Sequence, residues 1–102
     1  MTPSVIAHRG DSAHAPENTL RSVRQALAKN ADWIEVDLQL TRDGQAVVFH
    51  DEDLHRLTGQ IGRVENHSSS ELRDLHVMPS LHEPGDDSRI TDLTNLLAEP
   101  NA

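Results

Sequence analysis

Residues 33–40 alternate between apolar and polar side chains with a period of two, which is the pattern of a β-strand with two unlike faces. Four apolar side chains fall on one face: Ile34, Val36, Leu38 and Leu40. Three polar side chains fall on the other: Glu35, Asp37 and Gln39. For a lone pair of carboxylates, a half-buried strand with water on its polar face is the ordinary explanation. The segments on either side of the strand change that interpretation.

The strand is followed by an Asp-Gly turn signal at residues 43–44 and by a second β-prone run at residues 46–49. If residues 43 and 44 are the two central residues of a tight turn, antiparallel pairing sets Asp37 opposite His50. The sequence therefore predicts a hairpin that holds an imidazole and the carboxylates of Glu35 and Asp37 on one face.

Two patterns ahead of the strand complete a strand, helix and strand unit. Residues 4–7 form a short apolar run that ends at His8 and is a candidate strand. Residues 19–29 carry an apolar stripe at helical spacing, with Asn18 as a candidate N-cap, and we assign this stripe to core packing. In this order the elements predict a βαβ unit whose two strands run parallel.

The carboxyl ends of parallel strands lie at one edge of a sheet, where α/β folds usually carry their chemistry. His8 and Arg9 stand at the end of the first strand, Glu35 and Asp37 lie in the second, and His50 ends the hairpin. The alternative for the first pair is a histidine that caps the strand and an arginine in a surface salt bridge. We expect the five residues to converge although they are spread along the chain.

Beyond His50 the patterns predict local structure rather than chemistry. Residues 51–58 are expected to form a loop in which Arg56 pairs with a carboxylate, and residues 68–71 match the capping box of a helix. Residues 79–89 are expected to be an exposed loop. The apolar residues at positions 90, 93, 96 and 97 predict an amphipathic helix with Thr91 or Asp92 as a possible cap and an end near Glu99-Pro100. The other histidines follow no ligand spacing and are assigned to the surface or to loops: His14, His55, His67, His76 and His82.

Composition restricts the partners. At 102 residues the chain is one domain at most, and its net charge of -8 argues against nucleic acid or an anionic membrane as the principal partner. The absence of cysteine excludes disulfides and thiolate metal sites. The chain starts without a leader pattern and lacks an apolar run of about 20 residues, so we expect a soluble cytoplasmic protein without stable membrane insertion.

The five converging residues suit one type of chemistry. Paired carboxylates bind hard divalent cations such as Mg²⁺ or Ca²⁺, and two histidines can act as general base and general acid near neutral pH. An arginine beside them would bind a phosphate oxygen. This set of groups favours cleavage of a phosphoric ester over hydrolysis of a peptide or a glycoside.

The chain resembles the N-terminal portion of the glycerophosphodiester phosphodiesterase family. The resemblance covers residues 4 to about 76 and rests on seven short motifs in order: His8-Arg9-Gly10, Pro16-Glu17-Asn18-Thr19, Glu35-x-Asp37, Thr41-x-Asp43-Gly44, Val48-x-His50-Asp51, Leu54-x-Arg56-x-Thr58 and Gly62-Arg63-Val64. It implies a TIM-type (β/α)8 barrel. It also implies hydrolysis of small phosphodiesters such as glycerophosphocholine or glycerophosphoethanolamine to glycerol 3-phosphate and an alcohol, with a divalent cation, Mg²⁺ or Ca²⁺.

By position, the resemblance implies that His8 and His50 are the general acid and base, in an order that stays open. It implies that Arg9 is the phosphate ligand and that Glu35 and Asp37 are metal ligands. In the family a neighbouring glycerol hydroxyl is a plausible internal nucleophile, which would give a cyclic phosphate that water then opens.

A TIM barrel takes roughly 200 residues or more, so residues 1–102 are expected to form a partial, incomplete domain of this family. By resemblance, a further metal-ligating glutamate and a lysine belong to strands beyond residue 102. Two interpretations follow: an enzyme that needs self-association or a complementing chain, or a truncated non-catalytic remnant with at most a weak divalent-cation site. An activity on intact lipid is disfavoured because the chain lacks an apolar interfacial segment.

Overall fold

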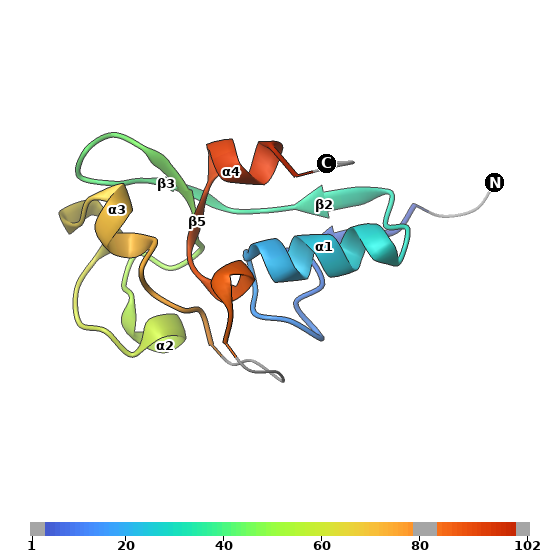
Figure 1. Ribbon diagram of the computed structural model, residues 1–102, viewed down its shortest axis with the longest axis horizontal. Coiled ribbons are helices and arrows are strands. Elements are labelled where there is room, and N and C mark those ends of the chain that lie inside the picture. The colour runs from blue at the N-terminus through green and yellow to red at the C-terminus, as the bar shows by residue number, and fades with distance from the viewer. Residues whose placement is uncertain (1–3, 79–83, 100–102) are drawn as a thin grey trace.

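Two small β-sheets lie next to each other along one layer of the molecule (Figure 1). The computed structural model describes residues 4–78 and 84–99 of the chain. In chain order its elements are β1 (Ile6–His8), α1 (Leu20–Ala28), β2 (Trp33–Glu35), β3 (Leu38–Leu40), β4 (Ala46–Val48), α2 (His55–Thr58), the 3-10 helix η1 (Val64–Asn66), α3 (Ser69–Leu72), the 3-10 helix η2 (Asp86–Ser88), β5 (Thr91–Asp92) and α4 (Leu93–Leu97). Strands β1 and β2 form one sheet, and β3, β4 and β5 form the other.

The predicted βαβ unit is confirmed. Strands β1 and β2 pair in parallel, with Ile6 beside Trp33 and His8 beside Glu35, and α1 connects them. The predicted N-cap is wrong by one residue, because Thr19 accepts the hydrogen bond from the Ser22 backbone N–H at the start of α1. Asn18 cannot cap this helix because its backbone is left-handed, with φ of 58°.

The single strand predicted over residues 33–40 is interrupted. Strand β2 ends at Glu35 and β3 begins at Leu38, because at Asp37 the chain passes from the parallel sheet to the antiparallel one. Leu38 and Leu40 are exposed, so the predicted apolar face is not buried along β3. Gln39 turns inward instead, and its side chain donates hydrogen bonds to the carbonyl groups of Phe49 and Asp51.

The predicted hairpin forms, but its register differs by one residue. Leu38 lies opposite Val48, and the loop holds three residues, 42–44, of which Gly44 has φ of +76°. A left-handed glycine at the end of a three-residue loop is a common hairpin connection, and it adds one residue to the two-residue turn that we expected. Phe49 therefore pairs with Asp37, and His50 lies one position beyond it.

The helix predicted near the end of the chain is confirmed with Asp92, one of its two possible caps, and it covers Leu93–Leu97, so Ile90 lies ahead of it. Thr91 and Asp92 form β5, which pairs with β4, and α4 follows with Asp92 as the N-cap. The capping box at residues 68–71 is confirmed at the start of α3. Of the loop predicted over residues 79–89, residues 79–83 and thus His82 lie outside the described residues, and η2 forms within the remainder.

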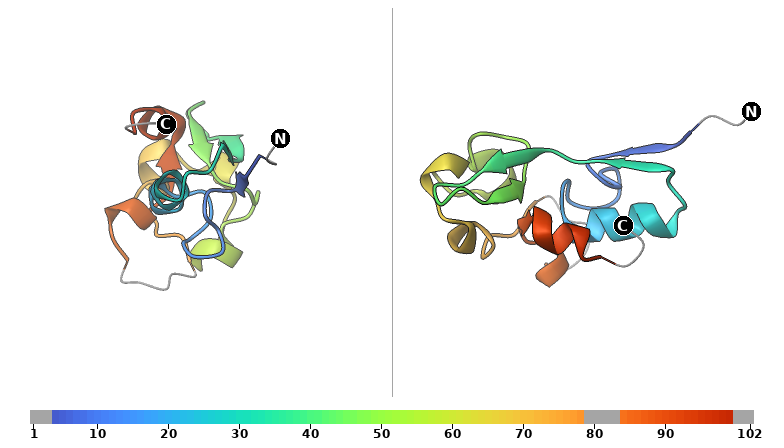
Figure 2. Two further views of the ribbon diagram at one scale, coloured as in Figure 1. Left: turned by 90° about the vertical axis from the view of Figure 1, so that its right-hand side faces the viewer. Right: turned by 90° about the horizontal axis from the view of Figure 1, so that it is seen from above.

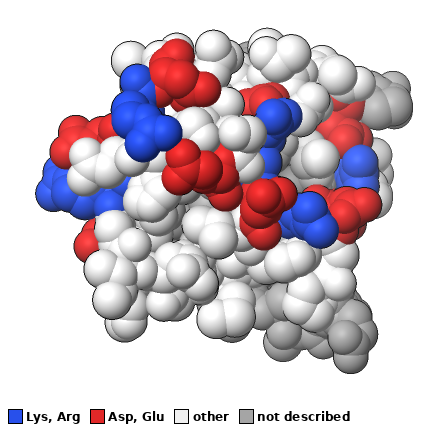
Figure 3. All heavy atoms as spheres, turned by 60° about the vertical axis from the view of Figure 1, so that its left-hand side comes forward, with Lys and Arg blue, Asp and Glu red and all other residues white. Residues whose placement is uncertain are grey.

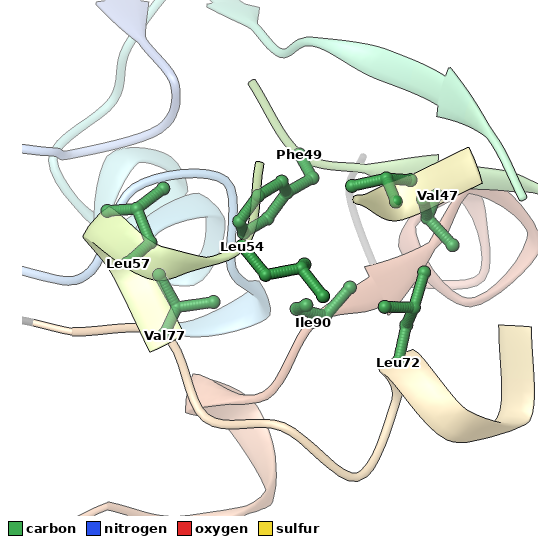
Figure 4. Packing of buried hydrophobic residues seen from close by; sticks show 8 residues of the cluster. Val47, Phe49, Leu54, Leu57, Leu72, Val77 and Ile90 are labelled. Carbon is green, nitrogen blue, oxygen red and sulfur yellow. The ribbon is translucent and has the colours of Figure 1, made fainter. Parts of the chain in front are cut away.

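The core consists of two apolar clusters on opposite sides of β4. Consecutive side chains of a strand point to opposite faces, so Val47 packs in one cluster and Val48 in the other. The first cluster lies under the hairpin and is formed by Val47, Phe49, Leu54, Leu57, Val64, Leu72, Val77 and Ile90 (Figure 4). The second cluster joins the apolar stripe of α1 to β2 and α4, which confirms that this stripe is core.

In the described part of the chain, helices cover one face of the parallel sheet and leave the other open. Viewed from above, α1 and α4 lie on the same side of β1 and β2 (Figure 2). On these strands Ile6 is 63% exposed and its neighbour Trp33 is 66% exposed. Within residues 4–78 and 84–99, the helices are all too short or too polar to span a lipid bilayer.

Candidate active site

His8 and Glu35 contact each other at the carboxyl ends of the two parallel strands. The strand register sets them side by side, and His8 Nε2 lies 2.9 Å from Glu35 Oε2. Both side chains are accessible, with exposed fractions of 64% and 40%. The parallel pairing therefore brings together one predicted catalytic histidine and one predicted metal ligand.

Arg9 lies between two carboxylates directly after β1. Its backbone is left-handed, and its carbonyl accepts hydrogen bonds from the Asn18 backbone N–H and from the Ser22 hydroxyl. This turn directs the guanidinium toward Glu17, 2.9 Å from Nη1, and toward Asp37, 3.2 Å from Nε. The Arg9 side chain is only 20% exposed, so it lies in a partly buried ionic cluster rather than in the surface salt bridge of the alternative interpretation.

Asp37 is held by Asn18 as well as by Arg9. The Asn18 side-chain amide donates to Asp37 Oδ2 at 3.1 Å, and the Asp37 backbone N–H donates to Asn18 Oδ1 at 3.2 Å. Asn18 lies between the turn after β1 and helix α1. There its side chain is buried and its backbone is left-handed. At the break between β2 and β3, side chains therefore bind the Asp37 carboxylate and N–H, while the Asp37 carbonyl still accepts a hydrogen bond from the Phe49 N–H.

His50 is paired with the next residue, Asp51. His50 Nδ1 lies 2.8 Å from Asp51 Oδ1, and Arg56 binds both oxygens of the same carboxylate, at 2.7 and 3.0 Å. The Arg56 guanidinium and, to a lesser degree, His50 lower the pKa of Asp51 to about 2, while its partial burial opposes that shift. Asp51 is therefore ionised at neutral pH, and the predicted pairing of Arg56 with a carboxylate is confirmed.

Arg56 also reaches Glu17, which joins the two halves of the site. Its Nη1 and Nη2 atoms each lie 3.3 Å from an oxygen of Glu17, the carboxylate that also binds Arg9. Carboxylates on both sides raise the pKa of Arg56 above its ordinary value. One continuous polar network results, formed by His50, Asp51, Arg56, Glu17, Arg9, Asp37 and Asn18.

The structure thus pairs His8 with Glu35 and Arg9 with Asp37, and it connects His50 to Arg9 through three intervening residues. Sequence reasoning assigned no role to Glu17 or Asp51 and assigned Asn18 only to a helix cap, although all three lie within motifs that carried the resemblance. Glu17 and Asn18 could have been identified from the sequence. They are two polar residues between Pro16 and the start of a helix, so the apolar packing of that helix does not explain them.

The remaining histidines of the described segments lie away from this network. His14 and His55 are exposed, and His14 contacts Asp11 and Lys29. His67 and His76 are half-buried and bind the Arg63 carbonyl and the Ser88 hydroxyl.

The site offers oxygen ligands of the type that a divalent cation prefers, but their number is small. Glu35 and Asp37 offer carboxylate oxygens, the ligand type that Mg²⁺ and Ca²⁺ prefer. Among the residues that the structure describes, no group of three or more histidine, aspartate or glutamate side chains is arranged to hold a metal ion. The donor chemistry therefore fits a hard cation, while metal ligation by Glu35 and Asp37 stays a prediction.

The lysine and arginine side chains of the described residues lie in ion pairs with carboxylates. Figure 3 shows one face on which basic side chains lie beside acidic ones, without a broad area of one sign. Two hollows lie near the parallel sheet. One, of about 370 Å³, is lined mainly by apolar residues of α1, β2 and α4, and the other, of about 270 Å³, is bordered by His8, Gly10 and Asp11. Only the second adjoins a residue of the candidate site.

The sequence matches known proteins over most of its length. The sequence profile of the glycerophosphoryl diester phosphodiesterase family matches residues 8–102. A glycerophosphodiester phosphodiesterase of Caldanaerobacter subterraneus subsp. tengcongensis is 47% identical over 75 residues, which are 74% of this chain and 31% of the relative. Human glycerophosphodiester phosphodiesterase 1 is 38% identical over 98 residues, 94% of this chain and 30% of the relative. The chain spans about a third of the length of these curated relatives.

Solved structures show the same similarity in three dimensions. A glycerophosphodiester phosphodiesterase of Agrobacterium tumefaciens superposes with a TM-score of 0.84 at 33% identity, covering 94% of this chain and 42% of that one. An Oleispira antarctica phosphodiesterase, in complex with the product sn-glycerol-3-phosphate, gives a TM-score of 0.79 at 36% identity, covering 92% and 38%. The predicted fold class, an incomplete TIM-type barrel, is confirmed, and the described strands form two small sheets that do not close into a barrel.

Proposed function

Because the chain belongs to the glycerophosphoryl diester phosphodiesterase family, we propose that it acts in the hydrolysis of glycerophosphodiesters to glycerol 3-phosphate and an alcohol. Substrates such as glycerophosphocholine and glycerophosphoethanolamine carry one phosphodiester between glycerol and a head group. The observation that carries the proposal is the cluster at the carboxyl ends of β1 and β2, where Arg9 lies among carboxylates and His8 contacts Glu35.

We assign the proton transfers to His8 and His50. Both imidazoles are accessible, with side chains 64% and 45% exposed, and both contact a carboxylate that can orient the ring. Arg9 would bind a phosphoryl oxygen and offset its charge, a role that suits a guanidinium placed by ion pairs with two carboxylates. Which histidine gives the proton and which takes it depends on the orientation of the substrate.

Glu35 and Asp37 would hold the divalent cation. When bound, Mg²⁺ or Ca²⁺ supplies positive charge that stabilises the negatively charged oxygens of the reacting phosphodiester. In the described chain Asp37 is already fixed by Arg9 and Asn18, so its carboxylate is positioned before a cation arrives. Further oxygen ligands would have to come from water, substrate or other parts of a longer or associated polypeptide.

A second candidate follows from the small number of ligands. The described residues hold no group of three side chains arranged for a metal, which favours a non-catalytic member of the family that binds a divalent cation weakly. Under this alternative the site residues are present while turnover is absent. Both candidates treat residues 1–102 as part of one domain of the family.

Release of glycerol 3-phosphate from glycerophosphocholine tests the proposal. The 102-residue chain is assayed with Mg²⁺, with Ca²⁺ and with a chelator, beside His8→Ala, His50→Ala and the control His55→Ala, whose exposed ring lies outside the network. We expect metal-dependent release that is lost in the first two variants and kept in the control. Release that survives in either site variant would contradict the histidine assignment, and no release from a folded sample would favour the non-catalytic candidate.

A further inference from the structure

Arg56 uses its whole guanidinium to join two carboxylates from distant parts of the chain. Nε and Nη2 bind the two oxygens of Asp51, which follows the hairpin, at 2.7 and 3.0 Å. Nη1 and Nη2 reach the two oxygens of Glu17, which precedes helix α1, at 3.3 Å each. Since all three nitrogens of its guanidinium donate to protein carboxylates, Arg56 is arranged to hold other residues rather than to bind a substrate.

The Asp51 carboxylate determines which nitrogen of His50 carries hydrogen. With its pKa lowered to about 2, Asp51 is ionised near neutral pH and can only accept a hydrogen bond. His50 Nδ1, at 2.8 Å, is therefore the donor, and in the neutral ring the lone pair lies on Nε2. A ring in this tautomer presents Nε2 as a base.

We propose that Arg56 is a positioning residue for the candidate active site: by clamping Asp51 it holds His50 in the Nδ1–H tautomer, and through Glu17 it ties this histidine to Arg9. The inference rests on the proposed function in that it makes Nε2 of His50 the proton-transferring atom. Arg56 acts through its two carboxylates and touches neither the substrate nor the reacting atoms.

The surroundings of Arg56 differ from those of an ordinary surface arginine. Arg63 provides the comparison, because it also joins two carboxylates, Glu52 and Glu65, and its side chain is similarly exposed, 48% against 52%. The carboxylates of Arg63 are 77% and 65% exposed, whereas Asp51 and Glu17 are only 22% and 13% exposed. Partly buried partners keep their geometry better than solvated ones, so the Arg56 bridge can orient a ring.

Nitrogen NMR of the histidine rings tests the proposal independently of turnover. Long-range ¹H–¹⁵N spectra of the labelled 102-residue chain at about pH 8, where an ordinary imidazole is neutral, distinguish the two tautomers of His50. The variants are Arg56→Gln, Arg56→Lys and the matched control Arg63→Gln, with His50→Ala to assign the signals. Asp51→Asn serves as a second route, because an amide can donate to Nδ1 and so favours hydrogen on Nε2.

We expect the Nδ1–H tautomer in the native chain and in Arg63→Gln. In Arg56→Gln its ratio to the other tautomer should fall about two- to five-fold, the effect of losing one partly exposed charged pair, with partial recovery in Arg56→Lys. An unchanged ratio in both Arg56→Gln and Asp51→Asn would overturn the proposal, as would an Nε2–H tautomer in the native chain. Since the ratio is read without substrate, absent turnover would refute the proposed function and leave this test intact.

Discussion

Asn18 and Asp37 bind each other twice, once through side chain to side chain and once through side chain to backbone. The amide of Asn18 donates to the Asp37 carboxylate, and the Asp37 N–H donates to the Asn18 carbonyl oxygen. These contacts link the turn ahead of α1 to the break between β2 and β3. A residue that the sequence predicted only as a helix cap therefore fixes one of the predicted metal ligands.

Replacing Asn18 by glycine should lower the free energy of unfolding by about 1–3 kcal/mol, because the partly buried Asp37 loses two hydrogen bonds and keeps Arg9 as the partner of its carboxylate. Glycine keeps the left-handed backbone, so strain does not confuse the result. Urea denaturation provides the measurement. The control is Asn30→Gly, at an exposed position with nearly the same φ of 59°, which should change stability by less than about 0.5 kcal/mol. Equal effects at both sites would contradict this account.

Gly10→Ala should destabilise the chain far more than Gly44→Ala. Both glycines are left-handed, at φ of +75° and +76°, so alanine at either site costs about 1–2 kcal/mol of backbone strain. A Cβ at position 10 would also lie 2.7 Å from the backbone carbonyl carbon of Ser22, whereas position 44 is open, and this crowding adds about 1–3 kcal/mol. Thermal or urea unfolding of the two variants compares them directly, and similar losses would mean that the β1 turn adjusts freely.

Asp51 should stabilise the fold above about pH 4 and lose this effect in acid. Its pKa is lowered from 3.8 to about 2, so the folded state binds the proton less readily than the unfolded chain. The stabilisation is complete above the unfolded pKa and disappears as pH falls from about 4 to about 2; allowing for the exposure of Arg56 it amounts to about 1–2 kcal/mol. The difference in unfolding free energy between the native chain and Asp51→Asn should shrink over this range. A constant difference would show that the ion pair contributes nothing.

Glu35→Gln and Asp37→Asn should each raise the concentration of Mg²⁺ or Ca²⁺ that gives half-maximal turnover. They should raise the dissociation constant for the cation, measured directly by calorimetry, in the same way. Loss of one charged oxygen ligand weakens binding of a hard cation, by about ten-fold or more. Glu65→Gln is the control, because its carboxylate is exposed and its salt bridge within the described residues is with Arg63. If both site variants titrate like the native chain, the acidic face of β2 is only solvated.

Leu54→Ala should cost about 2–5 kcal/mol, because this side chain is fully buried in the cluster beneath the hairpin. Leu40→Ala, on the exposed side of β3, removes the same atoms from a side chain that is 65% exposed and should change stability by less than about 0.5 kcal/mol. Chemical denaturation of both variants measures the difference. A large loss at Leu40 would mean that another surface covers β3 in solution.

Features that depend on neighbouring residues could be predicted from the sequence. The period of α1, the parallel βαβ unit and the capping box of α3 follow from local patterns and from the handedness of connections, and all three are confirmed. The hairpin register was wrong because a third loop residue, allowed by the left-handed Gly44, brings Phe49 rather than His50 opposite Asp37. The sequence indicates that Phe49 is buried. It does not indicate that the loop must have three residues for Phe49 to reach the core.

The strand order predicted that His8 and Arg9 approach Glu35 and Asp37, but other contacts between distant residues were beyond the reach of these patterns. Arg56 was expected to pair with a carboxylate, and the local partner Asp51 fits that expectation. Its second partner, Glu17, lies 39 positions away, and only the packed arrangement of the β1 turn, α1 and the hairpin brings the two together. Likewise Ile90 was assigned to a helix because its spacing fits one, whereas pairing of β5 with β4 draws it into the core.

The open face of the parallel sheet gives the chain an optical reporter. Trp33 is the one tryptophan in the sequence, and two-thirds of it faces solvent beside Ile6. Its fluorescence should therefore resemble that of indole in water, and emission should move to shorter wavelength when another polypeptide covers this face. Titration of the chain with itself, or with the remaining strands of a related barrel, can be followed at this single residue without attaching a dye.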